Sequence, residues 1–357
     1  ALLAVVGRHD ALRLRFARNG AGEWFQQVAL SEDGRSLGVV DLRASGENWK
    51  AHLRTQGERL QASLNLGAGP VIRAGWFRLP DGSARLLLAI HHLSVDGVSW
   101  RILLGDLQEA LEQTGSTITL PPGVLPWSAW VEAVRHYGER SEAVDELAWW
   151  QTYLADTSPD LPVDLTAERP NASSETIRWR ADEELTRRLI EAAPRAYRMG
   201  VEDILLAALG QALGSWSEQD RVLVDLEGHG REDVLPGLDL SSTVGWFTTR
   251  YTAVVPVADD ARASLIGTKE SIRSIPDRGF GLGVLRSMAS AEVRDAARAL
   301  PRSLVSFNYL GQFDQTLKQG GPLGFASENA GPQTDAGGNM DYVLNLNSMV
   351  AGGCLSF

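Results

Sequence analysis

His91-His92-Leu93-Ser94-Val95-Asp96-Gly97-Val98-Ser99-Trp100 lies between a short apolar segment and an amphipathic one. The preceding residues 86–90 are apolar at every position, which predicts a central strand of a sheet. From 100 to 111 the apolar residues recur at helical spacing, with Ser99 as the expected N-cap. Because α/β proteins place their sites where a strand ends and a helix begins, this corner is the first candidate site.

This stretch contains two adjacent histidines. Adjacent residues at a strand end point to opposite sides, so at most one of His91 and His92 faces a given cavity. The Asp96-Gly97 pair forms a turn, and the Asp96 carboxylate is able to orient an imidazole or to brace the loop. A purely structural histidine pair at a strand-to-loop corner stays open as the alternative.

A second polar island, Asp225-Leu226-Glu227-Gly228-His229-Gly230-Arg231-Glu232, follows an apolar strand expected over 221–226. It fits a solvated turn with a local Arg–Glu pair. It fits equally well a functional carboxylate that close backbone packing around Gly228 and Gly230 holds at the strand end. Composition alone leaves these two interpretations equal.

The third island is Phe307-Asn308-Tyr309-Leu310-Gly311-Gln312-Phe313, at the end of a strand expected over 303–309. An aromatic-rich strand end is ordinarily part of a core. The side chains of Asn308 and Tyr309 are nevertheless able to donate hydrogen bonds to a developing oxyanion, so the island is also a candidate site.

Length and composition limit the number of domains and the classes of partner. A chain of 357 residues is expected to form two domains. The net charge of −11 argues against a nucleic-acid partner, since phosphate binding needs a basic surface. The single Cys354 excludes a disulfide framework and a thiolate metal cluster, and a cytoplasmic setting fits best. No apolar run reaches the length of a membrane span.

Strands and helices mix in both halves, which predicts an α/β fold with two lobes. A segment with three prolines over 155–176 marks the linker, so we expect an N-terminal lobe over 1–154 and a C-terminal lobe over 177–357. The apolar start at Ala1, without a Met or a signal sequence, suggests that the natural beginning of the first lobe is missing.

Other catalytic motifs are missing from the sequence. It contains no Gly-x-Ser-x-Gly, no phosphate loop and no His-Glu-x-x-His. The glycines at 279–283 lack the acidic partner of a dinucleotide site. No metal site is therefore expected.

Taken in order, the three islands resemble the condensation-domain superfamily of nonribosomal peptide synthetases, and specifically its epimerization domains. The stretch from His91 to Gly97 matches the superfamily signature HHxxxDG. Further matches are found at Arg8 to Arg13, Val98 to Leu104, Glu227 to Glu232, Thr243 to Thr248 and Phe307 to Gly311. Three departures occur: the family's opening segment is absent, Thr252 replaces a usual Pro, and Leu282 replaces a usual Tyr.

The resemblance implies a V-shaped pseudo-dimer of two chloramphenicol-acetyltransferase-like lobes with a central tunnel. By position, His92 is then the catalytic histidine and Glu227 its partner acid or base. Asn308 and Tyr309 would lie near the thioester and stabilise the enolate. Asp96 and Gly97 would be structural at the site, with Arg13 as the expected partner of the Asp96 carboxylate.

The implied function is epimerization at the Cα of a carrier-bound aminoacyl or peptidyl thioester. No permanently bound cofactor is implied, because the substrate arrives on the 4'-phosphopantetheine arm of a peptidyl carrier protein. The other implied partners are neighbouring synthetase domains. A peptide-bond-forming condensation domain and a non-catalytic carrier-docking module are the alternatives, and which of His92 and Glu227 takes the L proton stays open.

Overall fold

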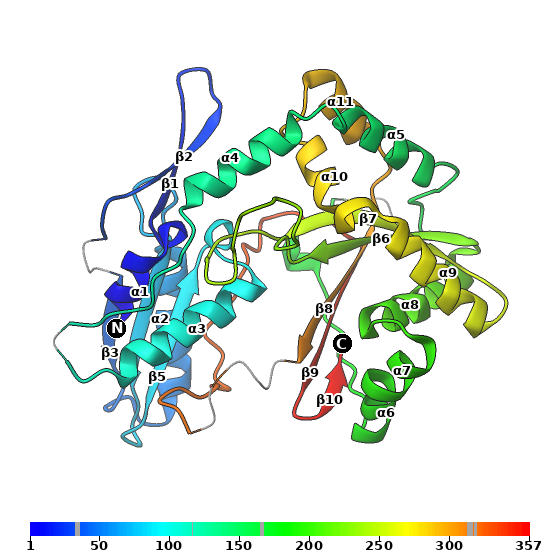
Figure 1. Cartoon of the computed structure of the whole chain (residues 1–357). Helices are drawn as coiled ribbons and strands as arrows, with labels where there is room; N and C mark the ends of the chain where they lie inside the picture. The colour runs from blue at the N-terminus through cyan, green and yellow to red at the C-terminus, as the bar shows by residue number, and fades with distance from the viewer. Residues whose placement is uncertain (33–35, 116, 165–167, 313–316, 318–319) are drawn as a thin grey trace. The chain divides into compact units, whose positions relative to one another are not determined.

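The computed structural model describes residues 1–32, 36–115, 117–164, 168–312, 317 and 320–357, and most of its helices and strands are labelled in Figure 1. The chain forms two compact units. Unit 1 comprises Ala1–Trp130, Gly237–Phe247 and Thr316–Asp335, and unit 2 comprises Val131–Pro236, Thr248–Gln315 and Ala336–Phe357. This division differs from the lobes expected over 1–154 and 177–357, because 131–154 joins unit 2 and two later segments return to unit 1.

Unit 1 combines two small sheets with helices. Its helices are α1 (Leu2–Arg8), α2 (Trp49–Ala62), α3 (Gly97–Glu112) and the first residues of α4 (Trp127–Gly138), with 3₁₀ turns η1 (Asp10–Arg13), η2 (Gly46–Asn48) and η3 (His92–Ser94). Its strands are β1 (Leu14–Arg18), β2 (Trp24–Val28), β3 (Leu37–Asp41), β4 (Ile72–Arg78) and β5 (Ala84–Ile90).

The three-stranded sheet of unit 1 has the order β3-β4-β5. Strand β3 is parallel to β4, and β4 is antiparallel to β5. Among the described residues β5 is therefore an edge strand, and the expectation of a central strand over 86–90 is wrong. Most of its residues are half-buried, so its apolar sequence reflects packing on both faces rather than pairing on both edges.

One face of this sheet packs on α2 around the fully buried Phe77. The late segment 320–335 is attached to the same unit by polar bonds. Arg85 Nη2 lies 2.8 Å from Glu328 Oε1, and Gln61 Nε2 donates to the Ala330 carbonyl at 2.9 Å. A segment more than 240 residues away in sequence thus completes unit 1.

Unit 2 contains one mixed sheet and most of the helices. The helices assigned wholly to it are α5 (Ala143–Tyr153), α6 (Glu183–Arg187), α7 (Ala193–Tyr197), α8 (Val201–Ser217), α9 (Ala261–Ser274), α10 (Phe280–Leu285) and α11 (Ala291–Ala299), with the short turns η4 (Asn171–Ser173), η5 (Arg188–Ala192, a π-helix) and η6 (Pro276–Gly279). Its strands are β6 (Arg221–Gly228), β7 (Thr249–Pro256), β8 (Val305–Gln312), β9 (Leu344–Ala351) and β10 (Cys354–Ser356).

The sheet of unit 2 has the order β10-β9-β8-β6-β7. Strands β6, β8 and β9 are parallel, whereas β7 and β10 are antiparallel to their neighbours. Helix α8 packs on the face that carries Val222 and Val255, where a Cβ on Gly210 would lie 2.4 Å from Val255 Cγ1. Both units mix helices and sheets, so the expected α/β class is confirmed.

Several local predictions are confirmed and several are not. Residues 201–216 are apolar around most of a helical circumference, which predicts a buried helix, and this helix is α8. Asp260, a residue type that favours N-caps, caps α9 by accepting the Ala263 N–H at 2.9 Å. The Trp-rich segment 127–153, with charged residues at its other positions, predicts one helical stretch, but it forms two helices, α4 and α5. Helix α4 ends at Gly138, a residue of low helix propensity. The alternation of Leu and Arg over 12–16 predicts a strand, but the strand begins only at Leu14, after the turn η1.

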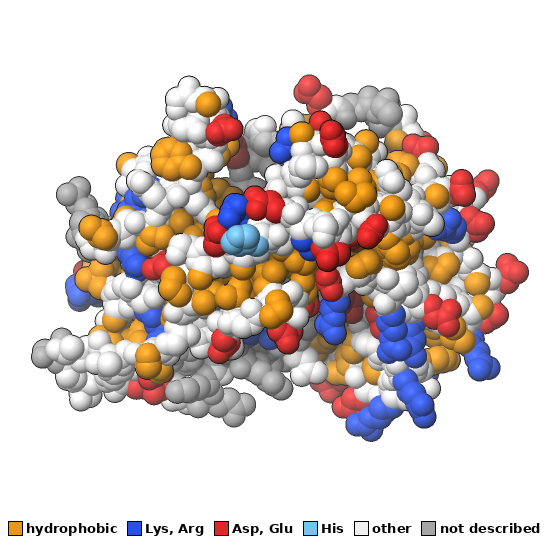
Figure 2. Space-filling model, turned by 45° about the horizontal axis from the view of Figure 1, so that its top comes forward, with side chains coloured by type: hydrophobic (Ala, Val, Ile, Leu, Met, Phe, Trp, Pro, Cys, Tyr) orange, Lys and Arg blue, Asp and Glu red, His pale blue; other side chains and the backbone are white. Residues whose placement is uncertain are grey.

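The surface mixes apolar and charged side chains. Figure 2 shows hydrophobic side chains spread over the face in view, with acidic and basic side chains between them. Among the described residues no helix has the length and apolar character needed to cross a membrane, and no group of three or more His, Cys, Asp or Glu side chains could hold a metal ion. Residues 165–167 of the expected linker lie outside the described residues.

Candidate functional site

His91 is the structural member of the histidine pair. It is half-buried at the end of β5, and its Nδ1 accepts the Leu93 N–H at 3.2 Å, which caps η3. Burial, followed by the charge of the neighbouring His92, lowers the pKa of His91. A neutral ring with Nδ1 as acceptor carries its proton on Nε2. His91 therefore serves the local backbone.

His92 is exposed and differs from His91 in its surroundings. Its ring makes an edge contact with Trp246, with ring centroids 5.2 Å apart and an interplanar angle of 67°. Within the part of the chain that the structure describes, neither ring nitrogen of His92 takes part in a hydrogen bond or ion pair. Both nitrogens are therefore available to a ligand, with one side of the ring held by the indole.

Asp96 braces the loop between the histidines and α3. The carboxyl is buried, and its Oδ1 accepts the Ser99 N–H at 2.7 Å, so Asp96 rather than the predicted Ser99 is the N-cap of α3. Its Oδ2 accepts the Phe247 N–H at 3.0 Å, from a residue 151 positions later. Of the two roles that the sequence left open for Asp96, these bonds support the bracing role.

The segment that reaches Asp96 is held by further contacts inside unit 1. The Ser99 hydroxyl donates to the Gly245 carbonyl at 2.8 Å and accepts the Gly245 N–H at 3.1 Å. Phe247 makes edge contacts with the rings of Trp127 and Trp130. A Cβ on Gly245 would lie 2.2 Å from the Trp127 ring, so only glycine fits.

The sequence pattern of 244–257 predicts a strand, and this anchored segment explains why the strand forms only from Thr249. Residues 245 and 247 use their backbone groups on Ser99 and Asp96, so they are not part of a strand ladder. The same anchors place Trp246 beside His92. Sequence reasoning included Trp246 in the Thr243–Thr248 match but gave it no role, because nothing in the local sequence indicates a partner 154 positions earlier.

The expected pair between Arg13 and Asp96 is wrong. The Arg13 guanidinium instead donates to the carbonyl oxygens of Val6 (2.8 Å), Gly7 (2.6 Å) and Ala29 (3.0 Å) and to the carboxylate of Asp10 (2.8 Å). Arg13 lies one turn after α1, so its side chain satisfies the carbonyl groups that the end of this helix leaves unpaired.

In unit 2, Glu227 lies at the end of the buried strand β6 and is exposed. The parallel pairing of β6 with β8 aligns Asp225 with Ser306 and so brings Asn308 beside Glu227. Asn308 Nδ2 donates to Glu227 Oε2 at 2.8 Å. The structure thus brings together two residues that the sequence placed in separate islands.

The backbone after Glu227 is closely packed, as the functional interpretation of this island required. A Cβ on Gly228 would lie 2.6 Å from Thr249 Oγ1, and Gly230 has a φ of +65°, in the left-handed region that favours glycine. The turn also carries a local polar contact, between a histidine and a glutamate rather than the Arg–Glu pair of the alternative. His229 Nε2 lies 3.5 Å from Glu232 Oε1, so the turn also carries an ion pair when His229 is protonated.

Tyr309 lies on the opposite face of β8 from Asn308. Consecutive residues of a strand alternate between faces, and Tyr309 packs against the hydrophobic core of unit 2. Burial, and then the charge of Glu202, raises the pKa of Tyr309. The structure therefore does not bring Tyr309 to the Glu227–Asn308 pair. The last residue of this island, Phe313, lies outside the described residues.

A buried carboxylate that sequence reasoning did not single out lies two residues before Glu227, on the same face of β6. Asp225 Oδ1 accepts the Thr252 hydroxyl at 2.7 Å, and Oδ2 accepts the Tyr342 hydroxyl at 2.9 Å. Burial, followed by the charge of Asp225, raises the pKa of Tyr342. Thr252, which stands where the resembled family usually has Pro, thus supplies a hydroxyl donor that a proline would lack.

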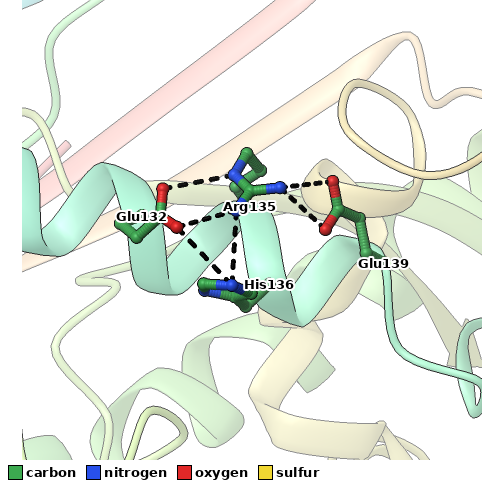
Figure 3. Close-up of polar contacts among 4 residues, drawn as sticks. All are labelled: Glu132, Arg135, His136 and Glu139. Carbon is green, nitrogen blue, oxygen red and sulfur yellow. Dashed lines mark hydrogen bonds and ion pairs between the residues drawn. The ribbon is translucent and has the colours of Figure 1, made fainter.

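A second cluster with a histidine lies on α4 and is drawn in Figure 3. Arg135 forms ion pairs with Glu132 and Glu139 at 2.7 Å each, and His136 Nε2 lies 3.5 Å from Glu132 Oε1. These side chains are 46–64% exposed and one helical turn apart. They form a solvated helix surface, in which each ion pair stabilises the helix by about a few tenths of a kcal/mol. They are not a candidate functional site.

Comparisons with known proteins identify the family. The Condensation domain family model matches residues 1–357. A component of the linear gramicidin synthase of Brevibacillus parabrevis is 38% identical over 99% of this chain, and a component of the mycosubtilin synthase of Bacillus subtilis is 36% identical over 99%. The chain spans only 5% and 14% of these relatives' lengths.

Solved structures agree with this assignment. The epimerization domain from the third module of tyrocidine synthetase B superposes with a TM-score of 0.89 at 32% identity, covering 99% of this chain and 79% of that one. The X-domain from teicoplanin biosynthesis shares the fold, with a TM-score of 0.73 at 18% identity over 100% of this chain and 80% of that one. The resemblance drawn from the three islands is confirmed, and the chain belongs to the condensation-domain family.

Proposed function

We propose that this domain epimerizes the Cα of an aminoacyl or peptidyl thioester that a carrier protein delivers during nonribosomal peptide synthesis. The observation that carries the proposal is the Glu227–Asn308 pair, an exposed carboxylate oriented by one amide donor at 2.8 Å. It supplies a second acid–base group besides His92. The similarity to an epimerization domain at 32% identity over 99% of the chain supports the same function.

The chemistry requires little more than these groups. A thioester acidifies its Cα–H, because the enolate oxygen takes the charge that the departing proton leaves behind. A base removes the proton from one face of Cα, and an acid returns a proton to the opposite face, so no net redox change occurs. One imidazole and one carboxylate meet this requirement if both reach the same carbon. Either His92 or Glu227 is able to take the L proton.

Asn308 serves this mechanism in two ways. One N–H of its amide holds the Glu227 carboxylate, and an amide nitrogen has a second N–H that is able to donate to the enolate oxygen. We do not assign that donor role to Tyr309, because its side chain packs against the core on the other face of β8. Trp246 limits the rotation of the His92 ring.

The substrate reaches these groups on the phosphopantetheine arm of a peptidyl carrier protein, with neighbouring synthetase domains on either side. The decisive test is deuterium exchange at Cα, with the intact domain and a loaded carrier in deuterated water. We expect rapid exchange and a mixture of L and D products. A loaded carrier that keeps its Cα proton in the presence of the folded domain would contradict the proposal.

A condensation domain is the second candidate, favoured by the family model that matches and by the shared HHxxxDG stretch. It needs His92 but has no evident use for Glu227. An amide product from two loaded carriers, without Cα exchange, would favour it. Carrier binding with neither reaction would instead indicate a docking module.

A further inference from the structure

Glu227 and Arg250 lie directly opposite each other in the antiparallel pair of β6 and β7. The Cβ atoms of such partners are about 5 Å apart, and opposite charges at these positions commonly pair. Among the described residues, however, no hydrogen bond or ion pair joins Glu227 to Arg250. The carboxylate has its bond from Asn308 instead.

The Arg250 side chain is held by residues that precede β9. Its Nη1 lies 3.3 Å from Asp341 Oδ2, and its Cζ lies 5.6 Å from the centre of the Tyr342 ring. The hydroxyl of Tyr342 is in turn fixed on the buried Asp225. Arg250 therefore has an alternative anionic partner in Asp341 and a fixed aromatic surface in the Tyr342 ring.

We propose that Asp341 is a positioning residue, which holds Arg250 so that the guanidinium does not neutralise the Glu227 carboxylate. An arginine paired with Glu227 would favour the ionised form and oppose its use as a proton donor. It would also compete with Asn308 for the carboxylate oxygens. This inference rests on the proposed acid–base role of Glu227, and it extends that role to two residues outside the three islands.

Other charged groups lie on the elements around Glu227, and the test must separate them from Arg250. The titratable and charged groups on the surrounding elements are Arg221 and Asp225 on β6, Arg250 and Tyr251 on β7, Tyr309 on β8, His229, Arg231 and Glu232 in the turn after β6, Arg278 in η6, Arg286 after α10, and Asp341 and Tyr342 before β9. Arg250 is directly across from Glu227, and its ion pair with Asp341 is solvent-exposed, with the Asp341 and Arg250 side chains 74% and 50% exposed. It can therefore be altered without disturbing the core.

The test uses the variant Asp341→Asn. The ¹³C NMR signal of the Glu227 carboxyl is followed as a function of pH, and the signal is assigned by its absence from the spectrum of Glu227→Gln. We expect the titration midpoint to fall by roughly half a unit or more, since an adjacent opposite charge shifts a carboxyl by about 1–3 units where it is shielded from water. Arg250→Gln in the same background should remove this shift. Glu184→Gln, which breaks an exposed pair with Arg187 on α6, is the matched control.

An unchanged midpoint in Asp341→Asn would overturn the inference, whatever happens to stability. A shift that persists in the double variant would also overturn it, because Arg250 would then not be the cause. The acid limb of the Cα exchange rate should move in the same direction as the midpoint. Because the NMR titration needs no turnover, a wild-type domain that fails to exchange would contradict the proposed function while this inference is still judged.

Discussion

Asp96 and Glu227 are the acidic residues of the two strongest motifs, and their surroundings are opposite. Asp96 is buried and accepts two backbone N–H groups, at 2.7 and 3.0 Å. Glu227 is exposed and accepts one side-chain amide. A buried carboxylate with its acceptors occupied stabilises the fold, because its removal leaves donors without partners. An exposed one with a single donor keeps the capacity to exchange protons.

The difference shows that an acidic residue in a motif does not by itself indicate catalysis. Asp96 joins the histidine corner to the segment ending at Phe247 and so holds Trp246 at His92. Glu227 is held at a strand end by its neighbours on β8. One carboxylate builds unit 1, and we assign the chemistry to the other.

The largest expected effect follows from Glu227→Gln. Loss of a general acid–base group lowers the rate by about 10²–10⁴-fold, and the Cα exchange rate should fall accordingly. The unfolding free energy should change by less than about 0.5 kcal/mol, because the side chain is exposed. Exchange at the wild-type rate would show that Glu227 is not the second acid–base group.

Asp96→Ala should show the reverse pattern. Two buried N–H groups would lose their acceptor, at about 1–3 kcal/mol for an unsatisfied group, so we expect a loss of about 2–4 kcal/mol in urea unfolding. Asp96→Asn keeps one carbonyl acceptor and should recover part of the loss. A variant as stable as the wild type but unable to exchange would give Asp96 a catalytic role and remove the contrast with Glu227.

The two neighbours on β8 test the same contrast within one strand. Asn308→Ala should lower the exchange rate by about 10–10²-fold, since it removes the donor that orients Glu227. Tyr309→Phe should leave exchange within about twofold, because its hydroxyl lies on the core face. Steady-state exchange of both variants is the measurement, and equal losses would place both side chains at the substrate.

Trp246 tests whether the segment anchored by Asp96 matters for His92. Trp246→Ala should lower the exchange rate by about tenfold through a less well oriented imidazole, while Trp246→Phe should retain most of the activity. Far-UV circular dichroism would check that both variants stay folded. An inactive Phe variant would indicate a role for the indole beyond its edge contact.

The smallest expected effect concerns a third carboxyl group, that of Glu202 at the start of α8. Among the described residues it accepts neither backbone N–H groups, as Asp96 does, nor a side-chain amide, as Glu227 does. It is half-buried, and within the described residues it has no hydrogen bond or ion pair. Burial, and then the charge of Asp203, raises the pKa of Glu202 to about 7. As pH rises, the Glu202 carboxyl loses its proton in the unfolded chain before it does so in the folded chain. The free energy of unfolding therefore falls as pH rises from about 4.5 to about 7.

Glu202→Gln removes this dependence. The variant should match the wild type near pH 4 and exceed it by about 1–2 kcal/mol at pH 8. Urea unfolding at the two pH values measures the difference. A stability gain of equal size at both would mean that the Glu202 charge is not responsible.

The sequence alone determined the α/β class, the family and most of the strand and helix positions. It did so because these depend on periodicity and on short motifs read within a few residues of one another. It also placed His92 and Glu227 at strand ends, where a side chain is exposed while the strand before it is buried. The same local patterns gave the wrong N-cap for α3 and the wrong first residue for β7, since both depend on hydrogen bonds to residues distant in the sequence.

Only the tertiary structure decided the partners. Nothing in the sequence indicates that Asp96 accepts the N–H of Phe247, that Arg13 closes the end of α1, or that Arg250 pairs with Asp341 across from Glu227. Strand pairing brought Asn308 to Glu227 and turned Tyr309 to the other face. Hydrogen bonds and ion pairs act over about 3–4 Å in space, and folding sets that distance independently of separation along the chain.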